Sequence, residues 1–305
     1  MTSRAPIRIA PNRPLAGVLW MLASGLSFVA VTGIVRYLGT GLPAAQGAFI
    51  RFGFGLVFLA PVLLGLLRSG LPQGTMRLFV ARGALHTLAV ILWFFAMARI
   101  PVAEVTAIGY LNPVVVTIGA AFVFGERLAA RRLLAVGVAI VGALIVLRPG
   151  LREIAPGHWA QLGAAASFGL SYLIAKRLSE LAPAVAVVAM MSLTVTIGLA
   201  PFAAWVWVPV TLAQVGWLGL VAAFATVGHY CMTRAFSCAP MTVTQPVIFL
   251  QLVWATLLGA LVFGEAVDPM VVLGGTLIIA AISYITWREA GIRRRTTPAA
   301  PETQI

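Results

Sequence analysis

Two stretches of this sequence repeat each other: residues 94–128 read FFAMARIPVAEVTAIGYLNPVVVTIGAAFVFGERL, and residues 234–267 read RAFSCAPMTVTQPVIFLQLVWATLLGALVFGEAV. A constant shift of 139 positions aligns them, and a shift of 140 aligns Ser27 and Phe28 with Ser167 and Phe168. The matched residues include Ala96 with Ala235, Pro101 with Pro240, Leu111 with Leu250, Thr117 with Thr256, and the Phe-Gly-Glu of 124–126 with that of 263–265. The chain is therefore predicted to be a duplication of one unit.

The composition indicates a membrane protein. Hydrophobic residues make up 61% of the 305 positions and charged residues only 10%, and the mean hydropathy is +1.02. Soluble domains carry roughly 25% charged residues, so this chain must cover most of its outside with lipid. The net charge of +13 is spread over the segments between apolar runs rather than gathered on one face, and nucleic acid is therefore not a predicted partner.

Ten apolar runs are predicted to cross the membrane as helices. A bilayer crossing needs about 20 apolar residues, and the first run is too long for the core of a cleaved signal peptide, so the N-terminus is expected to be retained. The ten runs are residues 15–38, 44–67, 76–98, 102–124, 133–147, 158–175, 184–208, 212–236, 241–263 and 270–287.

The basic residues predict how these helices are oriented. With the N-terminus in the cytoplasm, sixteen Lys and Arg fall in inner segments and four in outer ones, while Arg51 lies inside a run. This bias favours cytoplasmic termini and a multi-pass protein of a bacterial-type inner membrane. The expected segments are a cytoplasmic tail (1–14), a first copy (15–148), a periplasmic linker (149–157), a second copy (158–287) and a second cytoplasmic tail (288–305).

Each copy contains five crossings, which fixes the relation between the copies. Because five is odd, the second copy must enter the membrane from the opposite side. The predicted fold class is an all-α polytopic membrane protein with ten transmembrane helices arranged as two inverted five-helix repeats. Many secondary transporters use inverted repeats for alternating access, with the substrate near the midplane between them.

At the duplicated Phe-Gly-Glu, and at Ala48-Phe-Ile-Arg51-Phe in the second run, the sequence resembles the EamA family of the drug/metabolite transporter superfamily. This resemblance spans nearly all of residues 15–287. It implies transport of small metabolites: family members export amino acids and related compounds, some import metabolites, and relatives move nucleotide sugars. It also implies structural roles for the motif residues Pro113, Glu126 and Glu265. The position that matches Arg51 in the second copy is Met191, so any role of Arg51 is not duplicated.

An enzyme with a metal site is not favoured by the residues present. Asp268 is the single aspartate, and the histidines at 86, 158 and 229 form no His-Glu-x-x-His motif, so neither a paired-aspartate magnesium site nor that zinc site can be built. We predict no cofactor and no metal. Cys231 and Cys238 lie seven residues apart on one helix, too far apart for a disulfide.

Ionisable residues inside predicted spans are the first candidates for a substrate pathway, because they are costly there. Arg51 and Arg82 are candidate contacts for an anionic group, although Arg82 could instead extend to the cytoplasmic surface. His86 and His229 contact either substrate or packing partners. Trp93, Tyr110, Phe249 and Phe28 offer apolar or cation-π surface.

The fourth and ninth runs carry two alternative polar stripes. In the first stripe Tyr110 matches Phe249, and Gln245 lies on the same side of the ninth run as Phe249. In the second stripe Asn112 matches Gln251. The two stripes lie about 200° apart around the helix. Both stripes cannot fully face a cavity. The amides of Asn112 and Gln251 must meet protein, water or substrate, because lipid offers no hydrogen-bond partner.

The predicted function is export of amino acids, neutral or aromatic, by alternating access through a central cavity. No carboxylate falls deep in a span, which disfavours a cationic substrate and carboxylate-based ion coupling. Alternatives are metabolite uptake, a nucleotide-type anion, a polytopic membrane enzyme or a non-transporting scaffold. The expected partners are the lipid bilayer and a small-molecule substrate. The predicted pathway residues are Phe28, His86, Trp93, Tyr110, Asn112, Phe168, His229, Gln245, Phe249 and Gln251, with Arg51 and Arg82 as anion contacts.

Overall fold

The structure is a computed structural model, and it describes residues 14–71, 74–124, 130–151, 153–238, 247 and 249–296. These parts of the chain contain helices and no strand. The helices are α1 (Pro14–Leu38), α2 (Ala44–Ser69), α3 (Met76–Met97), α4 (Val102–Gly109), α5 (Asn112–Phe124), α6 (Ala130–Leu147), α7 (Pro156–Leu181), α8 (Ala184–Trp205), α9 (Leu212–Cys238), α11 (Gln251–Phe263) and α12 (Pro269–Thr296).

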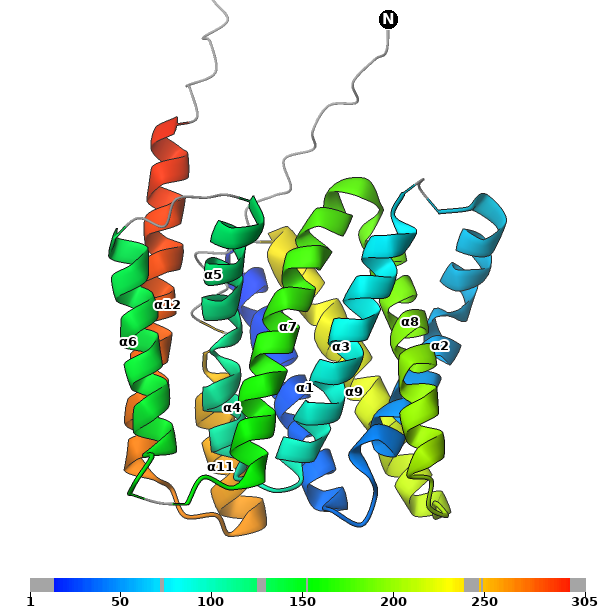
Figure 1. The fold of residues 1–305 in the computed structure, drawn as a ribbon, viewed down its shortest axis with the longest axis horizontal. Coiled ribbons are helices and arrows are strands. Elements are labelled where there is room, and N and C mark those ends of the chain that lie inside the picture. The colour runs from blue at the N-terminus through cyan, green and yellow to red at the C-terminus, as the bar shows by residue number, and fades with distance from the viewer. Residues whose placement is uncertain are drawn as a thin grey trace, which may run out of the picture.

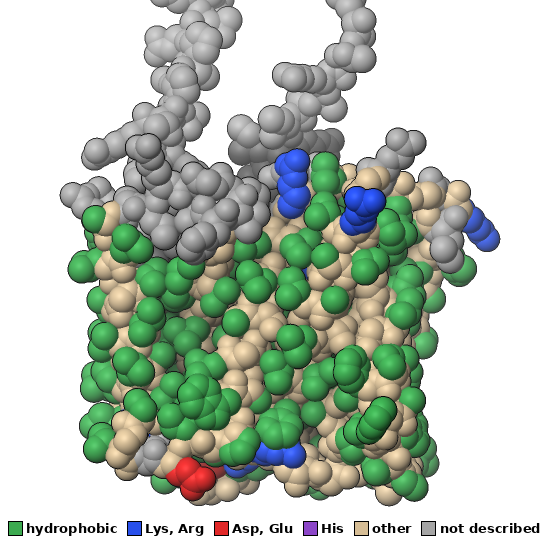
Figure 2. All heavy atoms as spheres, in the orientation of Figure 1, with side chains coloured by type: hydrophobic (Ala, Val, Ile, Leu, Met, Phe, Trp, Pro, Cys, Tyr) green, Lys and Arg blue, Asp and Glu red, His purple; other side chains and the backbone are tan. Residues whose placement is uncertain are grey.

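The helices have the length and hydropathy of membrane spans. Five are long and apolar enough to cross a bilayer: Leu15–Leu38, Ala44–Leu66, Met76–Met97, Ala186–Trp205 and Leu212–Met232. Four shorter apolar segments accompany them in the remaining helices. On the side shown in Figure 2, hydrophobic and uncharged groups fill a broad belt, and charged side chains appear at its upper and lower edges. This distribution fits a protein surrounded by lipid.

The helices run alternately up and down, so that α1 begins and α12 ends at the same face of the bundle (Figure 1). We call this the terminal face and the other the opposite face. The arrangement confirms the predicted fold class, an all-α membrane protein of ten crossings in two inverted five-helix repeats, with α4 and α5 together forming the fourth crossing.

The two copies interlock rather than lying side by side. Helix α1 packs along α9, and the equivalent pair of the other copy, α3 and α7, packs in the same way. The equivalent helices α2 and α8, and α6 and α12, also pack on each other. A Cβ on Gly142 of α6 would lie 2.7 Å from the carbonyl oxygen of Gly274 on α12. This backbone approach is the close packing that small residues permit between membrane helices.

The fourth run was predicted as one continuous helix, and the structure corrects this. Helix α4 ends at Gly109, Tyr110 and Leu111 form a turn, and α5 begins at Asn112. Pro113 explains the break, because proline lacks an N–H and its ring collides with the carbonyl of the residue four positions earlier. A broken helix at membrane depth is typical of positions that line the interior of a transporter.

Candidate functional site

Two pairs of aromatic rings lie where the copies meet. The Phe168 ring on α7 approaches the His86 ring on α3 with centroids 5.0 Å apart and planes at 68°. The Phe28 ring on α1 approaches the His229 ring on α9, also at 5.0 Å, with planes at 80°. Phe28 and Phe168 are equivalent positions of the repeat, so each copy presents its phenylalanine to a histidine of the other.

The pair around His86 extends into a larger cluster. His86 Nδ1 lies 3.2 Å from the Ser171 hydroxyl oxygen, and the Phe52 ring lies edge-on at 6.3 Å. Tyr172 stacks on Phe168 with planes 15° apart, and Trp93 meets Phe168 edge-on at 6.0 Å. His86, Phe52 and Ser171 are buried, whereas Phe168, Trp93 and Tyr172 remain accessible. We call these residues, together with Phe28 and His229, the central aromatic cluster.

Two arginines adjoin this cluster. Arg82, one helical turn before His86, is buried, and its Nη1 donates to the Val187 carbonyl at 3.0 Å. Its Nη2 lies 3.2 Å from the Met191 sulfur, and its Nε has no hydrogen-bond partner. Arg51 is half-buried, with its guanidinium 4.1 Å from the centre of the Phe52 ring. Phe52 in turn meets the His86 ring, so both arginines lie beside the His86 end of the cluster.

The aromatic stripe of the fourth and ninth runs lies at the repeat axis. The Tyr110 hydroxyl donates to the Phe249 carbonyl at 3.3 Å, and their rings meet edge-on at 5.3 Å. Both residues are buried. Because residues that the duplication relates touch each other, they must lie close to the axis that relates the copies. Gln245 lies outside the described residues.

The amide stripe bonds to neighbouring helices. With its amide nitrogen facing α7, Asn112 donates to the Ala165 carbonyl at 2.8 Å. The Gln251 amide nitrogen lies 3.5 Å from the Gly25 carbonyl of α1. Each amide therefore joins its helix to the first helix of the other copy.

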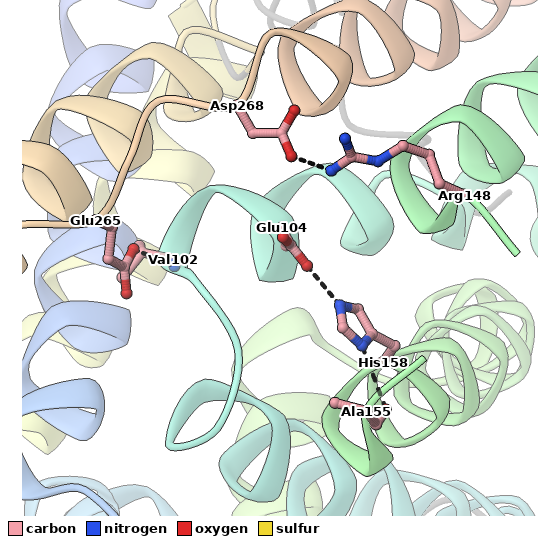
Figure 3. Close-up of polar contacts among 7 residues, drawn as sticks. All are labelled: Val102, Glu104, Arg148, Ala155, His158, Glu265 and Asp268. Carbon is pink, nitrogen blue, oxygen red and sulfur yellow. Dashed lines mark hydrogen bonds and ion pairs between the residues drawn. The ribbon is translucent and has the colours of Figure 1, made fainter. Parts of the chain in front are cut away.

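Polar contacts at the opposite face also join the two copies (Figure 3). Glu265, after α11, accepts hydrogen bonds from Arg36 at 3.0 Å and from the Val102 backbone N–H at 3.0 Å. Asp268 forms an ion pair with Arg148. Glu265 therefore joins the end of α11 to α1 and α4 of the other copy, whereas its counterpart Glu126 lies outside the described residues.

A buried pair completes this set. His158 Nε2 lies 2.5 Å from Glu104 Oε2, and both side chains are almost fully buried. His158 Nδ1 lies 3.3 Å from the Ala155 carbonyl (Figure 3). Nearby, the Gln46 amide exchanges two hydrogen bonds with the backbone of Val208. Sequence reasoning did not identify these contacts. We use the name opposite-face contacts for them and for the contacts of Glu265 and Asp268.

Asp268 titrates outside the membrane-spanning segments. Burial by itself would raise its pKa, but hydrogen bonds from the backbone at Met270 and Val271, and the charge and hydrogen bond of Arg148, outweigh this effect. The pKa of Asp268 therefore lies below its ordinary value. The carboxylate is charged at neutral pH, and the ion pair with Arg148 holds the start of α12 to the end of α6.

An apolar crevice opens elsewhere on the protein. It has a volume of about 530 Å³ and its lining carries no charged side chain: Pro43, Ala44, Ala45, Ile91, Pro201, Phe202, Trp205 and Val206. It lies between α2, α3 and α8, apart from the central aromatic cluster. A polar metabolite would find few hydrogen-bonding groups there.

No group of three or more His, Cys, Asp or Glu side chains in the described ranges could hold a metal ion. In the same ranges both cysteines are free thiols. Around the central aromatic cluster, the described residues offer hydrogen bonding, positive charge and aromatic contact.

Comparisons with known proteins place these features in a family. The model of the EamA-like transporter family matches residues 15–148 and 155–287. A riboflavin transporter of Rhizobium johnstonii is 31% identical over 97% of this chain and 99% of its own. An S-adenosylmethionine uptake transporter of Rickettsia bellii is 26% identical over 90% and 94%. A pseudopaline exporter of Pseudomonas aeruginosa is 26% identical over 90% and 98%.

A solved crystal structure shares the fold. It aligns with a TM-score of 0.56 over 93% of this chain and 97% of the other at 20% identity. The family match, the duplicated five-helix unit and the polar and aromatic residues between the copies agree with one another. The chain therefore belongs to the EamA-like family of the drug/metabolite transporter superfamily, as a multi-pass membrane transporter of small metabolites.

Proposed function

We propose that this protein carries a small metabolite with an aromatic or heteroaromatic ring across the bacterial inner membrane by alternating access. The observation that supports this most strongly is the symmetric placement of Phe28–His229 and Phe168–His86 between the copies. A substrate ring that inserts beside one of these pairs replaces the edge-on contact between phenylalanine and histidine with an edge-on contact to the substrate. Such contacts contribute about 0.5–1.5 kcal/mol each beyond area burial.

The relatives support a ring-bearing substrate. One is named a riboflavin transporter and another an S-adenosylmethionine uptake transporter. Both named compounds carry a fused heteroaromatic ring system. Riboflavin is therefore the first compound to test, with uptake as the first direction.

The terminal face is cytoplasmic in this proposal. The tails 1–14 and 288–305 then lie in the cytoplasm and the linker 149–157 in the periplasm. The distribution of Lys and Arg along the chain supports this orientation. Apart from the His158–Ala155 contact, each of the opposite-face contacts joins one copy to the other, and together they hold the periplasmic side closed. Opening to the periplasm requires them to break.

Export of neutral or aromatic amino acids is the second candidate. The half-buried Arg51 beside Phe52 offers a cation for a carboxylate, and the accessible Phe168 and Trp93 offer a surface for an aromatic side chain. A relative named as an exporter shows that the family works in this direction too. A nucleotide-type anion is a related candidate, because it also combines a ring with a negatively charged group.

Counterflow into proteoliposomes tests the proposal. Full-length protein is reconstituted with unlabelled compound inside, and labelled compound is added outside. The panel contains riboflavin, adenosine-type compounds, aromatic amino acids and, as ring-free controls, alanine and glutamate. We expect exchange of at least one ring-bearing compound and none of the controls. Exchange of the ring-free compounds alone would refute the proposal. The direction is decided in cells, by measuring whether the labelled compound accumulates inside them or is released from them.

A further inference from the structure

We infer that the transported molecule carries net negative charge and that Arg51 and Arg82 bind its anionic group. This inference rests on the proposed function and names the substrate class more narrowly, as an aromatic or heteroaromatic carboxylate or phosphate.

Arg82 supplies the first part of the argument. Its two partners, the Val187 carbonyl and the Met191 sulfur, are neutral, and its Nε is buried without a hydrogen-bond partner. A guanidinium offers five N–H donors and is always charged. A buried charge of this kind is normally paired with an opposite charge. Arg82 therefore has both donor capacity and uncompensated charge beside the central aromatic cluster.

Arg51 supplies the second part. It forms no ion pair or hydrogen bond in the described part of the chain, and its guanidinium contacts the Phe52 ring. The Phe52 ring that it contacts lies 6.3 Å from the His86 ring, and Arg82 lies one helical turn before His86 on α3. The two arginines thus border one region from α2 and α3, and a ligand among these groups experiences both charges.

Among the acidic side chains that the structure describes, none pairs with either arginine. Glu104, Glu265 and Asp268 bind partners at the opposite face, and the exposed Glu153 lies in the loop between α6 and α7. The other acidic residues are at positions 126, 180, 289 and 302, near helix ends or in the C-terminal tail. Among the described side chains the centre thus carries a surplus of positive charge, which an anionic ligand would balance.

The ligand's charge state follows from this surplus. A carboxylate or phosphate can accept two parallel hydrogen bonds from a guanidinium, which is the strongest geometry for such a pair. The ammonium group of a zwitterionic amino acid would instead meet two arginines and no described carboxylate. An aromatic anion fits both the charge and the rings, whereas a zwitterion fits only in part.

Matched substrates separate charge from ring shape. Proteoliposomes with the wild-type protein are given riboflavin and its phosphate ester, flavin mononucleotide. A second set compares indole-3-acetate, tryptophan and tryptamine, which share an indole ring and are an anion, a zwitterion and a cation. We expect the anion of at least one set to move about tenfold faster or more than its counterparts, the ratio typical of a charge-assisted hydrogen bond. The flavin set tests a phosphate and the indole set a carboxylate.

Variants then assign the effect to the arginines. Arg82→Gln and Arg51→Gln are each expected to slow the anion about tenfold and to slow the uncharged or zwitterionic compound less, so that the ratio of the two rates falls. Arg82→Lys, which keeps the charge but not the fork of donors, should retain part of the rate. Arg99→Gln is the matched control, because Arg99 is exposed just after α3 and its guanidinium bonds to the Phe95 carbonyl and lies over the Phe95 ring, away from the central aromatic cluster. If Arg82→Gln does not fold, Arg51→Gln carries the test alone, since no hydrogen bond of Arg51 is lost.

The outcomes distinguish the inference from the proposed function. Transport of riboflavin or tryptophan at the rate of its anionic partner, with no change of ratio in the arginine variants, overturns the inference and leaves an aromatic-metabolite transporter. Failure of every ring-bearing compound overturns the proposed function, and the inference with it. A preference for the anion that Arg99→Gln keeps and Arg51→Gln abolishes supports both.

Discussion

Replacing Glu265 by glutamine should loosen the opposite face. The carboxylate accepts from Arg36 through one oxygen and from the Val102 N–H through the other. Its side chain is 11% exposed and that of Arg36 is 23%, so solvent screens the pair only in part. Hydrogen bonds to charged groups contribute about 1.5–3 kcal/mol. Because Arg36 and Val102 belong to the other copy, losing these hydrogen bonds destabilises the state in which the opposite face is closed.

Distance measurement between the copies gives the readout. Spin labels replace Arg99 and Leu212, which are exposed and lie at the opposite-face ends of α3 and α9, after both cysteines are changed to serine. A loss of 1.5–3 kcal/mol changes the ratio of closed to open molecules roughly ten- to hundredfold. Glu265→Gln should therefore enlarge a population with a longer distance between the labels.

The control is Glu153→Gln, which makes the same chemical change in an exposed loop on the same face. It should leave the distance distribution as in the wild-type protein. An unchanged distribution in Glu265→Gln, with the label pair resolved in both samples, would show that this contact does not hold the copies together.

Three further changes test the packing and the other polar pairs. Glu104→Gln removes the charge facing His158 in a nearly fully buried pair and should lower stability by about 1–3 kcal/mol, seen as a lower thermal midpoint in detergent; an unchanged midpoint would contradict the pairing. Gly142→Val places side-chain atoms against the Gly274 carbonyl and should cost about 1–3 kcal/mol, whereas normal folding and stability would mean that α6 and α12 do not approach so closely. Asp268→Asn should destabilise the protein at neutral pH. The lowered pKa of Asp268 means that its stabilisation is present above a pH of about 4 and is lost as the pH falls through the folded-state pKa, so the difference from wild type should disappear in acid; a constant difference would refute this sign.

The helices and the inverted copies could be predicted because hydropathy and spacing report them directly. Long apolar runs such as those that became α1 and α3 have no alternative to the membrane. The break at Tyr110 and Leu111 was missed, although Pro113 signals it, because hydropathy does not fall across the turn. Hydropathy averaged over neighbouring residues depends on composition, and it does not register the backbone N–H that Pro113 lacks.

The site was predictable in residue type but not in pairing. Phe28 and Phe168 are related by the shift of 140, but His86 and His229 are 143 positions apart, so no constant shift shows that each phenylalanine meets a histidine of the other copy. The packing of α1 on α9 and α3 on α7 creates these pairs.

The opposite-face contacts were also invisible in the sequence. Glu104 and His158 are 54 positions apart on helices of different copies. The sequence around neither residue predicts that the two pair. Burial brings them together, because each polar group away from water needs a partner. Sequence can show which groups need partners, while the fold decides which partners they find.

Exchange of a ring-bearing substrate by variants of the two phenylalanines tests the central claim most directly. Phe28→Ala and Phe168→Ala are compared with Trp159→Ala, which removes a large ring that is 61% exposed on the outside of α7, in counterflow of the compound that the wild-type protein exchanges fastest. The account predicts at least a tenfold slower exchange for each phenylalanine variant, in correctly folded protein, and a wild-type rate for Trp159→Ala. Wild-type exchange in both phenylalanine variants would show that the substrate does not pass between Phe28–His229 and Phe168–His86.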